Sequence, residues 1–112
     1  MRLRTVLVEG PSMLPTLRAG DCLVVQRGRG VRPGDLVVAR FHARPGLLVV
    51  KRAVRPVPGG WELASDNPAV AGHGLTGGPG DVEAVVRWRY WPWPPTRLTG
   101  TEPESADPQS SA

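Results

Sequence analysis

Short apolar runs separated by turn-forming residues are the feature that most constrains this fold. The runs are rich in Val and Leu, and no window shows the sustained period of 3.6 residues that an amphipathic helix needs. Gly, Pro and Asp cluster between the runs, as they do in tight turns. We therefore predict an all-β fold, a compact barrel of short antiparallel strands. The strands are expected over residues 3–9, 22–26, 36–41, 47–54, 61–64 and 82–90.

The distribution of residue types indicates one domain followed by a tail. A chain of 112 residues, 40% of them hydrophobic, has room for one modest core. Residues 68–81 are rich in Gly and poor in large side chains, which predicts a long surface loop. Residues 95–112 are rich in Pro, Ser and acidic side chains and have too little apolar surface to fold. We assign the domain to residues 1–94 and expect residues 95–112 to be disordered.

The apolar segments are too short for a membrane span. None approaches the roughly 20 residues that a spanning helix needs. Near the start, Val6–Val8 are the only apolar residues between Arg4 and Glu9, so the apolar segment of a signal peptide is lacking too. The single Cys22 cannot form an internal disulfide, and its apolar neighbours predict a buried thiol. These features predict a cytoplasmic protein.

The net charge of +4 does not identify a partner. A basic body can bind nucleic acid or an acidic protein. However, the bias towards Arg runs through the whole chain, which favours a compositional origin for the charge. The one Cys and the two His residues are not clustered, and no Gly-rich phosphate loop occurs. We expect no metal and no cofactor.

Lys51 is the only lysine among 14 basic residues, so a role that Arg cannot fill is indicated. It follows the apolar run Leu47–Val50, and side chains alternate between the two faces of a strand. Lys51 should therefore share an apolar face with Val49 and Ala53, while Arg52 should face solvent. Loss of hydration lowers the pKa of a lysine and makes a neutral amine available as a base, whereas Arg keeps its proton.

Ser12 lies where a predicted strand gives way to a turn. Gly10 and Pro11 force the chain to turn sharply, which exposes the Ser12 hydroxyl and leaves backbone N–H groups free. Such a setting suits a nucleophile, although an ordinary turn serine would look similar. A Ser–His–Asp arrangement is less favoured, because His42 closes a strand and His73 lies in the Gly-rich segment.

Four segments resemble the ordered motifs of type I signal peptidases. They are GPSMLPTL at residues 10–17, RPGDLVV at 32–38, VVKR at 49–52 and SDNP at 65–68. This resemblance implies a signal-peptidase-like β-barrel with Ser12 as nucleophile and Lys51 as general base of a Ser/Lys dyad. It implies that the residues around the oxyanion and the substrate are Gly10, Pro11, Met13, Val49, Asp66 and Asn67.

Two departures from that family stand out. Many signal peptidases have a hydroxyl residue where this chain has Gly10, so an oxyanion would depend on backbone N–H groups, chiefly that of Ser12. After Asn67 the chain also lacks the Ser, Asp and Arg residues that help to orient the lysine in the family. The surroundings of Lys51 are therefore the least predictable part of the site.

A narrower resemblance is to the maturation proteases of nickel-type superoxide dismutase. It is carried by the small size, by Gly10–Met13 and Val49–Arg52, and by Arg87–Pro92. It implies a soluble endopeptidase that removes an N-terminal extension from a superoxide dismutase precursor, without nucleic acid, membrane span or cofactor.

Two alternatives remain open at this point. One is a general signal-peptidase-like protease without its membrane anchor. The other is a non-enzymatic β-barrel module that binds single-stranded nucleic acid through its basic body and its four Trp residues. Trp88, Trp91 and Trp93 cluster near the end of the chain, which favours a packed closing segment over a binding face.

Overall fold

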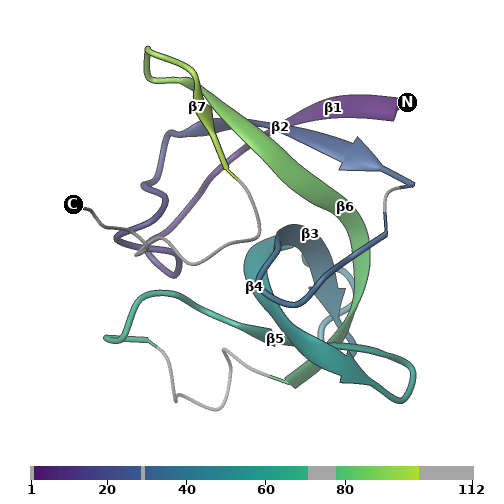
Figure 1. Cartoon of the computed structure of the whole chain (residues 1–112). Helices are drawn as coiled ribbons and strands as arrows, with labels where there is room; N and C mark the ends of the chain where they lie inside the picture. The colour runs from purple at the N-terminus through teal and green to yellow at the C-terminus, as the bar shows by residue number, and fades with distance from the viewer. Residues whose placement is uncertain (1, 29, 71–77, 99–112) are drawn as a thin grey trace, which may run out of the picture.

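Seven strands make up most of the structure, a computed structural model that describes residues 2–28, 30–70 and 78–98 (Figure 1). The predicted all-β, antiparallel fold is confirmed. Among the described residues no helix is long and apolar enough to cross a membrane. The strands are β1 (Arg2–Leu7), β2 (Cys22–Arg27), β3 (Leu36–Phe41), β4 (Val49–Val57), β5 (Gly60–Ala64), β6 (Gly78–Trp91) and β7 (Thr96–Arg97).

The long strand β6 joins two parts of the sheet. Its first half pairs with β3 and with β5, and β3–β4–β5 are paired in sequence, so these four strands close into a small barrel. Its second half pairs with β2 and β7, and β2 in turn pairs with β1. In Figure 1 the layer of β1 and β2 lies above the barrel, and β6 runs through both.

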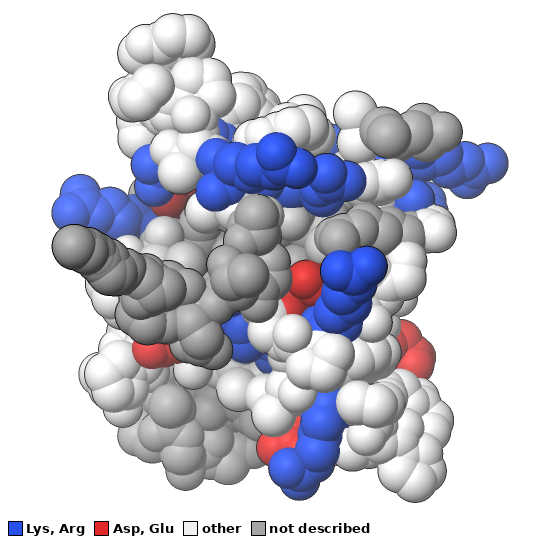
Figure 2. All heavy atoms as spheres, in the orientation of Figure 1, with Lys and Arg blue, Asp and Glu red and all other residues white. Residues whose placement is uncertain are grey.

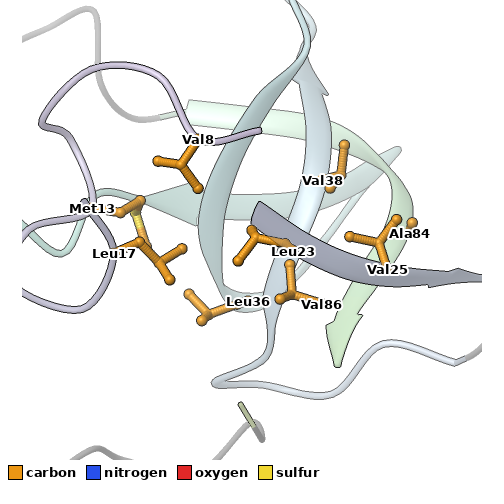
Figure 3. Packing of buried hydrophobic residues seen from close by; sticks show 9 residues of the cluster. All are labelled: Val8, Met13, Leu17, Leu23, Val25, Leu36, Val38, Ala84 and Val86. Carbon is orange, nitrogen blue, oxygen red and sulfur yellow. The ribbon is translucent and has the colours of Figure 1, made fainter. Parts of the chain in front are cut away.

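Two apolar clusters fill the spaces on either side of β3 and β6. Leu36 and Val38 face the cluster under the β1–β2 layer, whereas Val37 faces the cluster inside the barrel. Ala84 and Val85 divide in the same way on β6. Both faces of these strands are buried, which explains their uninterrupted apolar runs. Figure 3 shows the first cluster: Val8, Met13, Leu17, Leu23, Val25, Leu36, Val38, Ala84 and Val86.

The same turn is used twice, before β2 and before β3. Arg18–Asp21 and Arg32–Asp35 share the pattern Arg-x-Gly-Asp. In each, the Asp N–H donates to the Arg carbonyl at 3.0 Å, and the Asp carboxylate accepts from the Arg N–H at 2.9 Å. The glycines have φ of 97° and 94°, which a type II turn requires at its third position. Both carboxylates are buried and close their turns internally.

The strands β6 and β7 differ most from the predicted strand positions. β6 begins at Gly78, so its first residues lie in the segment expected to be a surface loop, of which residues 71–77 are outside the described part. β7 lies within the segment expected to be disordered. It forms a strand because it pairs with β6, and the neighbouring Leu98 packs on the first cluster. The remaining tail, residues 99–112, is outside the described part. Cys22, expected to be buried, is half-buried.

Candidate active site

A groove runs between the end of β1 and the start of β4. Its volume is about 510 Å³, and most of its lining is aliphatic. Ser12 and Lys51 both line it, although they are far apart in the sequence. The remaining lining residues are Val6, Leu7, Val8, Glu9, Met13, Leu47, Leu48, Val49 and Val50.

Both walls of the groove are open strand edges. In the described sheet, β1 is an outermost strand that pairs only with β2. On β4, Val49–Lys51 pairs with β3 on one side, whereas pairing with β5 starts only at Arg52. An open edge presents unpaired backbone N–H and C=O groups, which an extended peptide can bind by adding a strand. The groove therefore has the form of a peptide-binding cleft.

Lys51 is buried, with only 5% of its surface exposed. Its Nζ atom donates a hydrogen bond to Ser65 Oγ at 2.9 Å, and Ser65 is itself buried. No carboxylate among the described residues pairs with Lys51. Burial disfavours the charged ammonium and lowers the pKa of Lys51 below 10.5. The amine is thus oriented by a neutral hydroxyl that compensates for little of the lost hydration.

Ser12 begins a turn whose apolar side chains are anchored in the core. The next side chain, Met13, is 1% exposed, and Leu17 one turn later is fully buried in the same cluster (Figure 3). Within the turn, the Leu17 N–H donates to the Met13 carbonyl at 2.9 Å. Among the described residues, neither the Ser12 hydroxyl nor its N–H has a hydrogen-bond partner. The hydroxyl and an adjacent donor are therefore both free beside the groove.

Residues 66 and 67 clamp this turn onto β4. Asn67 donates from its N–H to the Ser12 carbonyl at 3.0 Å and from Nδ2 to the Pro11 carbonyl at 2.8 Å. The Asp66 carboxylate accepts from Thr16 Oγ1 at 2.6 Å. It also accepts from Arg52 Nη2 at 2.5 Å and Arg52 Nε at 3.2 Å. The serine turn is thus tied to the residue that follows Lys51.

The structure brings some of the predicted site residues into the groove and places others behind it. Ser12, Met13, Val49 and Lys51 line the groove. The other four do not line it: Gly10 precedes the turn with a φ of 80°, and Pro11, Asp66 and Asn67 take part in the hydrogen bonds that hold the turn. Ser12 and Lys51 are not hydrogen-bonded to each other, and Lys51 Nζ donates to Ser65 Oγ instead. Catalytic hydrogen bonds are commonly long in the absence of substrate and tighten when it binds.

The expectation that Arg52 faces solvent is wrong. Its side chain is only 15% exposed because the segment after β5 folds back over β4 and places Asp66 against it. Sequence reasoning also missed Ser65 as the partner of Lys51. The pairing of β4 with β5 explains the contact. Arg52 lies opposite Ala64, so in this antiparallel pair the preceding Lys51 lies beside the following Ser65.

The described residues include no group of three His, Cys, Asp or Glu side chains that could hold a metal ion. His42 lies beside Asp81, with His42 Nε2 3.1 Å from Asp81 Oδ1. The pair is exposed, and neither residue lines the groove. His42 is therefore not placed to act on Ser12.

A serine and a buried lysine on an apolar peptide groove suggest peptide-bond hydrolysis, and the comparison with known families agrees. The model of the Peptidase S24-like family matches residues 2–85, which include β1 to β5, both groove walls and Ser12 and Lys51. The chain belongs to this Peptidase S24-like family. No match was found among curated proteins. Membership of this family supports serine peptidase activity, and a peptidase implies a protein substrate.

Proposed function

We propose that this member of the Peptidase S24-like family is a serine endopeptidase with a Ser12–Lys51 dyad, and that it removes the N-terminal extension of a nickel-type superoxide dismutase precursor. The observation that carries the dyad is the burial of Lys51 on the groove that Ser12 also lines. A lysine with a lowered pKa has a neutral amine that can accept a proton at lower pH than an exposed lysine could.

The proposed reaction begins with proton transfer from the Ser12 hydroxyl to the neutral amine of Lys51. Ser12 Oγ then attacks the carbonyl carbon of the scissile bond, and the Ser12 N–H donates to the oxygen that gains negative charge. Collapse of this intermediate breaks the C–N bond, and the Lys51 ammonium protonates the departing amine. Lys51 next accepts a proton from water, which attacks the ester carbonyl; the bond from that carbon to Ser12 Oγ then breaks, and the Lys51 ammonium returns the proton to Ser12 Oγ.

The groove favours an extended, apolar peptide next to the cleaved bond. Val49 and Val50 line one wall and Val6 lies in the other, so side chains that alternate along a bound strand would meet aliphatic surface on both sides. Among the described residues that line the groove, Glu9 is the only carboxylate. The superoxide dismutase precursor as substrate rests on the sequence resemblance, carried by Gly10–Met13 and Val49–Arg52 together with Arg87–Pro92.

The test is incubation of the purified protein with that precursor, followed by sequencing of any new N-terminus. The proposal expects a single new N-terminus at the start of the mature dismutase. Ser12→Ala and Lys51→Ala should each abolish the cleavage while leaving the circular dichroism spectrum unchanged. Cleavage retained in a folded Lys51→Ala variant contradicts the dyad. Cleavage of unrelated export precursors but not of this one contradicts the substrate and favours a general signal-peptidase-like protease.

A further inference from the structure

Large aromatic side chains lie exposed at the end of β6. Tyr90, Trp91 and Trp93 are 40%, 58% and 74% exposed. They belong to the last residues of β6 and to the turn that leads into β7. This turn projects from the body at the upper left of Figure 1, and the surface there is uncharged in Figure 2. Exposed tryptophans in such a position are typical of interaction surfaces, where Trp is among the residues that contribute most to binding.

The strand register connects these aromatics to the groove. Leu7 on β1 pairs with Cys22 on β2, and Cys22 pairs with Trp91 on β6. Directly paired residues have their side chains on the same face of a sheet, and adjacent strands are about 4.8 Å apart. The register of β2 with β6 shifts between Cys22 and Leu23, directly beside this pair, but the side chains of Leu7 and Trp91 are both exposed. Their positions in the sheet are two strand spacings, about 10 Å, apart. Leu7 is 56% exposed and also lines the groove.

We propose that Leu7, Trp91 and Trp93, here called the apolar shelf, dock the protein substrate beside the groove. The occupant is an uncharged apolar stretch of the substrate, which leaves the groove at Leu7 and lies across the sheet face towards the tryptophans. This inference rests on the proposed function and extends it: the groove selects the residues at the cleaved bond, whereas the shelf selects the protein that carries them.

The size of the shelf favours such an accessory contact over a stable dimer interface. A stable interface buries roughly 800 Å² on each partner, and a large aromatic side chain buries about 150–250 Å² when it is covered completely. Three side chains that are already partly covered offer less than a dimer needs. They are sufficient for an accessory contact, because single tryptophan side chains can act as hot spots of binding.

The test compares two substrates in the full chain carrying both Trp91→Ser and Trp93→Ser. One substrate is the whole superoxide dismutase precursor, and the other is a short peptide that covers only the residues bound in the groove. We expect KM for the precursor to rise about thirtyfold or more with kcat unchanged, which corresponds to the loss of one hot spot. Kinetics on the short peptide should match those of the wild type. Val54→Ser, at an apolar side chain 36% exposed that does not line the groove, should change neither.

The other outcomes each overturn the shelf. Equal losses on both substrates mean that the variant damages the groove, and no change on either means that the substrate does not touch the tryptophans. Self-association of the wild type in sedimentation velocity, lost in the double variant, assigns the surface to a second copy. Binding to phosphatidylglycerol vesicles, lost in the double variant without an effect on KM, assigns it to a lipid surface. Failure of the wild type to cleave either substrate instead overturns the proposed function on which the shelf depends.

Discussion

At the scale of single residues, Lys51 shows how far alternation along a strand can predict an environment. The sequence predicts an apolar face for it, and the structure buries it beside Ala53, which is fully buried. Its partner could not be predicted in the same way. Ser65 reaches Lys51 because β4 and β5 pair antiparallel with Arg52 opposite Ala64, and that register depends on the whole hairpin. The catalytic role of Lys51 stays a prediction, and two experiments test its surroundings.

Replacement of Lys51 by Arg should abolish cleavage without unfolding the domain. The guanidinium keeps its proton, so the loss should reach the roughly 10² to 10⁴-fold contribution of a general base. In the wild type, kcat/KM should rise as the pH rises, because only neutral Lys51 accepts the serine proton. Since burial lowers the pKa of Lys51, the midpoint of this rise should lie below 10.5. A profile that still rises through 10.5, or an active Lys51→Arg variant, contradicts this base.

Ser65→Ala should lower kcat with little effect on KM, because Ser65 orients the Lys51 amine and does not line the groove. The hydrogen bond from Lys51 to Ser65 favours the ammonium form, so its removal should also shift the pH–rate profile to lower pH. Ser65→Thr keeps the hydroxyl and should restore much of the activity. An unshifted profile together with an unchanged kcat would show that the contact is only structural.

At the scale of elements, the segment after β5 decides how the serine turn is held. Asp66 and Asn67 belong to no strand, yet they connect that turn to Arg52 on β4. The resemblance to signal peptidases placed both residues near the site. Alternation along β4 correctly placed Arg52 on the face opposite to that of Lys51. It could not show that another segment covers this face and keeps Arg52 from solvent.

Asp66→Ala should lower the free energy of unfolding by about 2–3 kcal/mol, because it removes hydrogen bonds to a charged, largely buried Arg52 and to Thr16. Glu62→Ala is the matched control: it breaks the Arg55–Glu62 ion pair, whose Arg side chain is 67% exposed, and should cost no more than about 1 kcal/mol. Urea denaturation measures both values. Similar losses for the two variants would show that Asp66 does not clamp the turn.

At the scale of the whole molecule, the barrel closes where β5 meets the start of β6. Trp61 pairs with Gly80, and Gly80 is also opposite Phe41 on β3. A Cβ atom at Gly80 would lie 2.6 Å from the Arg40 carbonyl oxygen, and a Cβ at Gly60 would overlap with the Gly80 carbonyl oxygen. Three strands approach so closely here that only glycine fits.

Gly80→Ala should therefore destabilise the fold by about 1–3 kcal/mol or more, the usual cost of forcing atoms into a packed region. Gly30→Ala provides the control, because a Cβ at Gly30 meets nothing within 4 Å and the substitution should be neutral or slightly stabilising. Thermal unfolding followed by circular dichroism distinguishes them. Equal melting temperatures for both variants would contradict close packing at the barrel closure.

Local chemistry alone determined the all-β class, most strand positions, the two Arg-x-Gly-Asp turns and the unusual position of Lys51. Each of these depends on alternation of side chains or on residues that favour turns, which act over a few neighbouring positions. Only the tertiary structure decided that β6 begins at Gly78, that β7 forms, and that Ser65 and Asp66 serve the lysine and the serine turn. These features arise from pairings between distant segments, whose register is set by the packing of both cores at once.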